Sequence, residues 1–176
     1  MFKILDEKYV MIDAETLSNR ANSVIVQLGA VKFDVLNGIT DTFMVNIDSA
    51  DSKKYNCDIS KDTLEWWMKQ PAEIRKSWQV DKQPLREALM MFKDWYGTDK
   101  KYIWCNGASF DYPIVAWSFK ECDIELPWKY WDELDVRTIS TFFGYKLPKA
   151  NNHTAKDDAT AQANHLLKFF REIPAF

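Results

Sequence analysis

The sequence predicts an α/β fold in which a mixed five-stranded sheet carries helices on both of its faces. Runs rich in Val, Ile and Phe make up much of the first fifty residues. Beyond residue 60, apolar side chains recur mainly at the three- and four-residue spacing of helices, interrupted by short apolar runs. Antiparallel strands followed by alternating helices and strands are typical of a mixed sheet covered by helices.

Three strands are expected in the first part of the chain. Residues 8–16, KYVMIDAET, are mostly apolar, so this strand should be central, and residues 23–35, SVIVQLGAVKFDV, are rich in Val and Ile. Asn37-Gly38 then precedes residues 39–48, ITDTFMVNID. Because Asn-Gly between two strands is a tight-turn signal, we expect a β-hairpin here. Residues 50–59 are polar and are expected to be irregular.

Helices are expected from residue 60 onward. Ser60 is expected to cap the first helix, while Pro71 and Pro84 each suit the opening of a helix. Pro113 is tolerable only in a first helical turn. The expected helices are residues 61–70, 71–79, 84–96, 110–121 and 154–171, with a short strand at 101–106 and a strand leading into a further helix within 134–140.

Length and composition indicate one domain, residues 1–176, that is large enough to bury a core. The net charge of −3 argues against a protein that coats duplex nucleic acid with a broad basic face. This net charge does not exclude an enzyme that binds a few phosphates through metal ions. The 8 Trp, 7 Tyr and 11 Phe residues indicate a heavy core, an aromatic binding surface, or both.

The cysteines and the N-terminus bear on the cellular compartment. Cys57, Cys105 and Cys122 are scattered, so neither a disulfide framework nor a zinc site is expected. The first ten residues are too poor in apolar side chains for a signal sequence, and no run of about 18 apolar residues occurs. We therefore expect a soluble, cytoplasmic protein.

Two carboxylates stand near the end of the first expected strand. Asp13 and Glu15 are two residues apart, so in a strand they point to the same face. At a separation of roughly 4 Å they repel by about 4 kcal/mol at an effective dielectric constant near 20. A fold avoids this arrangement unless a cation lies between the groups or one carboxyl stays protonated. A solvated strand end is the plain alternative.

Two later patterns carry further acids. Asp111 follows the strand at 101–106 and begins a helix, where its carboxylate lies near the positive end of the helix dipole. His153 precedes Asp158 by five residues, a spacing that does not place both on one helix face. They converge only if Asp158 lies on the helix and His153 in the loop before it. Alternatively, Asp111 is a plain first-turn acid and His153 a capping or surface residue.

Together, D-x-E, F-D after a strand and H-x4-D at the start of the last helix resemble the DEDDh exonucleases of the DnaQ-like superfamily. The resemblance covers about residues 9–167. VIVQLGAVKFD, TLEWWMKQ, NGASFD, DVRT and HTAKDDATAQA are further similar to bacterial 3′–5′ exoribonucleases related to RNase T and to phage exonuclease A proteins. The resemblance implies an RNase H-like fold and a two-metal-ion 3′–5′ exonuclease that releases nucleoside 5′-monophosphates from single-stranded ends.

By motif position, the resemblance implies four metal-binding acids, namely Asp13, Glu15, Asp111 and Asp158. Carboxylates without thiolates suit two Mg²⁺ or Mn²⁺ ions. His153 would be the general base, because an imidazole titrates near pH 6.5 and can take a proton from the attacking water. Asp157 neighbours Asp158, but the five-residue spacing from His153 favours Asp158. His165 is expected at the surface.

Substrate contacts are expected close to these acids. Aromatic stacking, at about 1–3 kcal/mol per base, would replace much of the electrostatic grip on a few terminal nucleotides. Stacking is expected of Trp66, Trp67 and Phe110, although the two tryptophans point about 100° apart on a helix, and one of them is alternatively a core residue. Thr16, Leu17 and Asn106 are further candidates for contact with the terminal sugar, and a structural turn role is the alternative for Asn106. Asp135 and Arg137 of the DVRT motif are interpreted as structural.

Several alternatives remain open from the sequence. RNA is slightly favoured over DNA as the single-stranded substrate, since no feature of the sequence decides how a 2′-OH is read. A catalytically silent nucleic-acid-binding module and an oligonucleotide or dinucleotide phosphodiesterase are the competing functions. A zinc deaminase is disfavoured, because neither H-x-E nor P-C-x-x-C occurs. Relatives of this kind are often homodimers, so a homodimer is a further expectation.

Overall fold

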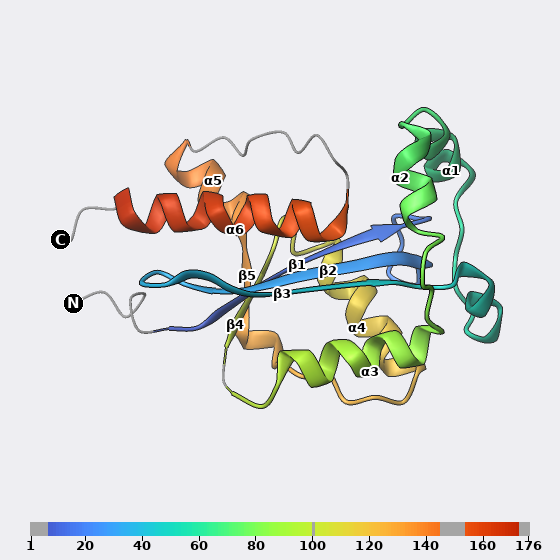
Figure 1. Cartoon of the computed structure of the whole chain (residues 1–176), viewed down its shortest axis with the longest axis horizontal. Coiled ribbons are helices and arrows are strands. Elements are labelled where there is room, and N and C mark those ends of the chain that lie inside the picture. Colours follow the sequence, from blue (N-terminus) through green and yellow to red (C-terminus); the bar gives the residue numbers. More distant parts are fainter. Residues whose placement is uncertain (1–6, 100, 145–153, 173–176) are drawn as a thin grey trace.

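A computed structural model describes residues 7–99, 101–144 and 154–172 (Figure 1). Its centre is a five-stranded sheet with the strand order β3-β2-β1-β4-β5. β1 pairs antiparallel with β2 and parallel with β4, so the sheet is mixed, as expected. The strands are β1 (Tyr9–Thr16), β2 (Ile25–Asp34), β3 (Gly38–Asn46), β4 (Tyr102–Cys105) and β5 (Glu133–Asp135).

The predicted hairpin joins β2 to β3 through the Asn-Gly turn. Gly38 has a φ of 76°, in the left-handed region that glycine adopts without steric cost. The side chain of Asp34 accepts a hydrogen bond of 2.6 Å from the backbone N–H of Asn37, which closes the turn. Local turn chemistry therefore sets the antiparallel register of β2 and β3.

The helices begin and end close to the expected positions. Ser60 caps the first of them, accepting a hydrogen bond from the backbone N–H of Thr63, and Pro113 lies in the first turn of its helix. The helices are α1 (Lys61–Met68), α2 (Ala72–Ser77), α3 (Leu85–Tyr96), α4 (Asp111–Glu121), α5 (Val136–Phe143) and α6 (Ala155–Glu172), with 3-10 turns η2 (Ser49–Lys54) and η3 (Tyr130–Asp132).

Part of the segment expected to be irregular is ordered as η2. The side chain of Asp48 accepts a hydrogen bond from the backbone N–H of Ala50 and caps this turn. Asp51 within it accepts a 3.0 Å bond from the backbone N–H of Leu85, the first residue of α3. The expectation of an irregular segment was wrong for residues 50–54, because polar side chains supply the bonds that apolar periodicity does not reveal.

β1 is buried on both faces. α3 and α4 lie on one side of the sheet and α6 on the other (Figure 1). Val10 and Ile12 pack toward α3 and α4. Tyr9 and Met11 pack with apolar residues of α6. A third apolar cluster joins β2 to α1 and α2; its buried members are Leu17, Val24, Val26, Trp67, Ile74 and Trp78.

His165 is not at the surface, so that expectation was wrong. Its side chain is 9% exposed, and its Nε2 lies 3.5 Å from the hydroxyl of Ser140. Ser140 belongs to α5, which lies beside α6 (Figure 1). Burial lowers the pKa of His165. Across the described residues, no helix combines the length and apolar character needed to cross a membrane.

Candidate functional site

Three carboxylates from two distant segments converge at the end of β1. Asp13 and Glu15 project from β1, and Asp158 projects from the first turn of α6. One carboxylate oxygen from each lies within 4.8 Å of the others. Along the face of β1 that α6 covers, the apolar side chains of Tyr9 and Met11 are followed by these two acids. The arrangement therefore offers an all-oxygen ligand set to a cation.

A glycine in β2 allows the start of α6 to lie very close to the sheet. Gly29 pairs with Asp13 in the sheet, and a Cβ at Gly29 would lie 2.2 Å from backbone atoms of Ala155 and Lys156. Only a residue without a side chain leaves room for the start of the helix at this distance. The first turn of α6, which carries Asp158, is thereby held directly against the strand pair.

Gln27 fixes the same end of α6 by hydrogen bonding. It is fully buried and pairs with Glu15 in the sheet. Its Oε1 accepts a 2.8 Å bond from the backbone N–H of Ala155, and its Nε2 donates a 2.7 Å bond to Asn46. Asn46 in turn donates to the backbone oxygens of Ser77 and Val80. A buried amide in the middle of an apolar strand was the sequence signal for such a role.

Asp111 lies beside the group of three rather than within it. It begins α4 on the opposite face of the sheet and is 3% exposed. Its Oδ1 accepts a 3.2 Å bond from the backbone N–H of Ala14, the residue between the two acids of β1. The fourth predicted acid therefore reaches the same strand end from another helix.

Burial and mutual repulsion raise the pKa values of these acids. The pKa of Asp13 lies well above its ordinary value because of burial, then because of the charges of Asp111, Glu15 and Asp158. Burial, followed by the charges of Asp158 and Asp111, raises the pKa of Glu15 to about 8. Burial raises that of Asp111 to about 7, opposed by the bond from Ala14. Bound divalent cations would relieve this repulsion, so the donor set and its electrostatics both fit them.

Gln162 is a neighbour of the acids that sequence reasoning missed. It lies one helical turn after Asp158 on α6, and its Nε2 donates a 2.8 Å bond to Oδ1 of Asp13. The four-residue spacing from Asp158 places both on one helix face and was the available signal.

The last motif contains two further candidates, His153 and Asp157. His153 lies outside the described residues. Asp157 is not among the three converging carboxylates; its backbone N–H donates to the hydroxyl of Thr154 at the start of α6.

The two tryptophans differ in exposure. Trp67 is 3% exposed, and its ring packs edge-on between those of Trp66 and Trp78. Its Nε1 donates a 2.8 Å bond to the backbone oxygen of Thr16 at the end of β1. Trp66 is 46% exposed. Trp67 thus supports the strand end from the interior, while Trp66 presents ring surface to solvent.

Thr16 and Leu17 follow the acids of β1 and are themselves buried. The hydroxyl of Thr16 donates a 2.8 Å bond to the backbone oxygen of Ser18, and Leu17 packs in the cluster under α1 and α2. Their side chains are committed to the local fold. The backbone N–H and oxygen of Leu17 are bonded to Val24 and Ser60, and the backbone oxygen of Thr16 accepts the bond from Trp67.

Asn106 and Phe110 lie in the segment that leads into α4. Both are partly buried, and Phe110 packs against the core beneath α3 and α4. Asp135 caps α5 and also accepts a 2.9 Å bond from the backbone N–H of Gly107. Arg137 donates a 3.0 Å bond to the backbone oxygen of Asn106. The structural interpretation of Asp135 and Arg137 is confirmed.

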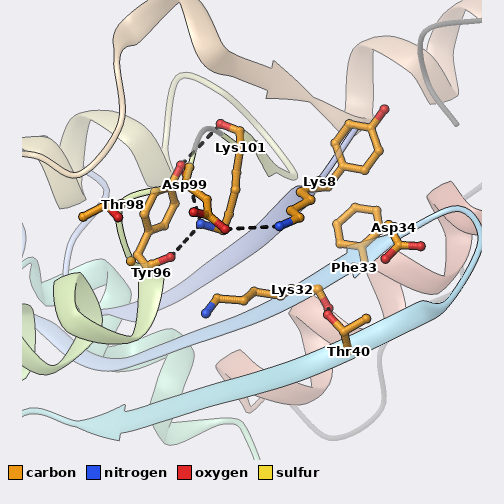
Figure 2. A pocket seen from close by; sticks show the side chains of 11 residues that line it. Lys8, Lys32, Phe33, Asp34, Thr40, Tyr96, Thr98, Asp99 and Lys101 are labelled. Atoms are coloured by element: carbon orange, nitrogen blue, oxygen red, sulfur yellow. Dashed lines mark hydrogen bonds and ion pairs between the residues drawn. The ribbon is translucent and has the colours of Figure 1, made fainter. Parts of the chain in front are cut away.

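A lysine-lined cavity of about 480 Å³ lies beside the start of β1 (Figure 2), whereas Asp13 and Glu15 lie toward the end of this strand. Lys101 is buried there and donates to the backbone oxygens of Tyr96 and Asp99 at 2.8 and 3.0 Å. Lys8 forms a 3.1 Å ion pair with Asp99, and Lys32 donates to the backbone oxygen of Trp95. Lys32 and Lys101 thus satisfy carbonyls at the end of α3, and Lys8 pairs with a side-chain carboxylate just beyond it, so the three lysines have structural roles.

Comparisons with known sequences agree with this geometry. The sequence profile described as the 3′–5′ exoribonuclease Rv2179c-like domain matches residues 8–172. An exodeoxyribonuclease of Enterobacteria phage T4 is 25% identical over an alignment that covers 73% of this chain and 68% of that protein.

Two examples illustrate the similarity in fold to solved structures. The zinc-bound complex of E. coli exonuclease I with single-stranded DNA has a TM-score of 0.71 and 14% identity; the match covers 94% of this chain and 41% of that one. The nuclease domain of 3′hExo, a DEDDh family member bound to rAMP, has a TM-score of 0.67 and 13% identity, covering 94% and 92%. This chain thus spans less than half of exonuclease I. The shared fold confirms the expected RNase H-like architecture.

Proposed function

The chain belongs to the 3′–5′ exoribonuclease Rv2179c-like domain family and is a DnaQ-like 3′–5′ exonuclease, and from this premise we propose that it shortens single-stranded RNA with two Mg²⁺ or Mn²⁺ ions. The observation that carries the proposal is the convergence of Asp13, Glu15 and Asp158 within 4.8 Å. The exoribonuclease description of the family supports RNA. The phage relative, an exodeoxyribonuclease, keeps DNA as the second candidate substrate.

Four acids would hold the ions in this proposal, namely Asp13, Glu15, Asp111 and Asp158. Bound divalent ions supply Lewis acidity that activates water and neutralises the charge developing on the phosphate. Gly29 and Gln27 hold the start of α6 against β1, which keeps Asp158 beside the two strand acids. The backbone N–H of Ala14 holds Asp111 toward the same strand end.

We assign the proton-accepting role to His153, which directly precedes Thr154 in the sequence. His153→Ala is expected to keep the Mn²⁺ affinity of the parent protein and to lose about 10²–10⁴-fold in kcat, the usual contribution of a general base. Single-turnover hydrolysis and calorimetric Mn²⁺ titration measure the two quantities. An unchanged kcat would remove His153 from the mechanism.

Contacts to the terminal nucleotides are assigned to the surface around these acids. Trp66 offers an exposed ring for stacking. Phe110 and Asn106 lie shortly before Asp111 in the chain, and Thr16 and Leu17 follow Glu15. Trp67 would act indirectly, by holding the backbone of Thr16.

Gel analysis of 5′-labelled RNA and DNA strands with Mg²⁺ or Mn²⁺ tests the function. The parent protein is expected to shorten RNA stepwise, and Asp158→Asn to abolish the shortening. Asp157→Asn is the matched control, since it changes the neighbouring acid that does not join the three converging carboxylates. Binding without shortening would indicate the silent module, and turnover restricted to dinucleotides would indicate the phosphodiesterase. Faster shortening of DNA would overturn the RNA assignment.

A further inference from the structure

Gln162 makes a direct contact with one of the acids proposed to bind metal. It lies on α6 one turn beyond Asp158 and is 8% exposed. Its Nε2 donates a 2.8 Å hydrogen bond to Oδ1 of Asp13, across the interface between α6 and β1. The helix α6 thus carries Asp158, one of the three converging carboxylates, and also Gln162, which contacts a second one, Asp13.

The bond restricts the orientation of a carboxylate that is otherwise loosely defined. The terminal torsion of an aspartate has a broad energy profile, so its two oxygens sample many directions unless something holds one of them. Gln162 holds Oδ1 of Asp13. Hydrogen bonds of this kind orient metal ligands and affect metal affinity in other proteins.

The amide suits this position better than a charged donor would. A Lys or Arg would also donate to Asp13, but its positive charge would compete with a cation among the acids. A neutral amide orients the carboxylate and leaves its charge for the ion. Met or Leu would fill a similar volume without any donor, so the donor is the distinctive feature of Gln162.

The other end of the amide is also informative. Oε1 of Gln162 is buried and has no hydrogen-bond partner within the described ranges. Buried side-chain oxygens usually have a partner. A donor that enters with the ions would satisfy it, and Mg²⁺ usually keeps several water molecules when it binds a protein.

We propose that Gln162 is a positioning residue for the metal site: it orients Asp13 through Nε2 and receives a donor that enters with the ion through Oε1. This inference rests on the proposed function, because it concerns the same acids. The competing explanation is simple packing, in which Gln162 only fills space between the buried Ala159 and Ala163 of α6 and the sheet.

Calorimetric titration of the purified full chain with Mn²⁺ alone tests the proposal without measuring turnover. Gln162→Met keeps the length of the side chain and removes both hydrogen-bonding groups. We expect its Mn²⁺ dissociation constant to rise by about 10–100-fold. Asn164→Met is the matched control, since Asn164 is an exposed amide on the same helix, and its affinity should equal that of the parent.

Two further measurements separate positioning from packing. Thermal melting in the presence of a chelator shows whether each variant is folded. If Gln162→Met does not fold, Gln162→Ala replaces it, because alanine favours the helical conformation. Hydrolysis by the variant should recover toward the parental kcat at saturating Mn²⁺, because the change acts on affinity. Parental Mn²⁺ affinity in a folded Gln162 variant would overturn the inference while leaving the proposed function standing. A parent protein that neither binds Mn²⁺ nor shortens RNA would overturn both.

Discussion

Trp66 and Trp67 are adjacent in the chain, yet their side chains have different surroundings. Their ring centroids are 4.6 Å apart at an interplanar angle of 73°. Trp67 is enclosed and bonds to the backbone at the end of β1, while Trp66 is half exposed. A single turn of α1 therefore combines one side chain that supports the end of β1 with one whose ring is exposed to solvent.

Substitutions should separate these two roles. Trp67→Phe leaves the backbone oxygen of Thr16 without its donor and is expected to lower the free energy of unfolding by about 1–3 kcal/mol. Trp66→Ala should change stability less but raise the KM for an oligonucleotide by about tenfold, the loss of one stacked base. Denaturant unfolding and steady-state kinetics measure the two effects. The interpretation fails if the two variants exchange phenotypes.

At the scale of secondary-structure elements, the contact between β2 and α6 decides the geometry of the site. Gly29 permits the approach, and Gln27 bonds to the first N–H of the helix. Both residues lie opposite an acid of β1 in the sheet register. The strand that neighbours the acids thus determines where the helix with the third acid begins.

Gly29→Ala is expected to displace the start of α6 and weaken Mn²⁺ binding. The new Cβ would meet backbone atoms at 2.2 Å, and backbone cannot yield as a flexible side chain does. We expect a loss of stability of about 1–3 kcal/mol or more. Gly38→Ala in the same hairpin is the control: its positive φ costs roughly 1–2 kcal/mol, but nothing lies within 4 Å of its Cβ. Equal Mn²⁺ affinities in the two variants would contradict the role of Gly29.

The end of α3 provides a second prediction for an element. Lys101→Met removes the donor to the backbone oxygens of Tyr96 and Asp99 and should lower stability by about 1–3 kcal/mol. Nuclease activity should not change, because this cavity is lined by residues at the start of β1, whereas the acids lie toward its end. Lys8→Met removes only an exposed ion pair and should have little effect on the melting temperature. A melting temperature unaltered by Lys101→Met would refute the capping role.

For the whole molecule, the acids couple folding to pH and to metal ions. The pKa of Glu15 rises from its ordinary 4.5 to about 8 in the folded chain. Between these values the folded state keeps a proton that the unfolded chain releases. A rise in pH therefore favours the unfolded state and lowers the stability of the metal-free protein. Bound cations favour the ionised carboxylates and oppose this loss.

Thermal melting in chelator should consequently show a lower melting temperature near pH 8 than near pH 5. Glu15→Gln should reduce this difference without abolishing it, because the pKa values of Asp13 and Asp111 are also raised. Addition of Mn²⁺ should raise the melting temperature of the parent most at the higher pH. A pH dependence identical in parent and Glu15→Gln would argue against the burial of an uncompensated charge at this position.

The aromatic content is divided between core and surface. Many rings enter the core, where Phe92 alone contacts the rings of Phe43, Tyr96 and Trp128. Others, among them Trp131, stay exposed. The heavy core expected from the composition is present. A homodimer stays a prediction, which sedimentation measurements would test.

Short-range chemistry made most of the elements predictable. Apolar alternation, the Asn-Gly turn and the Ser60 cap each act over a few residues, so the strands, the hairpin and the helix starts could be derived from the sequence. The two-residue spacing of Asp13 and Glu15 likewise fixed their common face. Resemblance to known motifs then linked these acids to Asp111, Asp158 and His153.

Only the tertiary structure decided which side chains meet. The bond between Gln162 and Asp13 joins positions 149 residues apart, and the burial of His165 depends on where α5 packs. The difference in exposure between Trp66 and Trp67 depends on the apolar cluster beneath α1, which encloses only Trp67. Such contacts depend on how the helices pack on the sheet. Local periodicity indicates which face of a helix is buried, but it does not indicate which residues that face will contact.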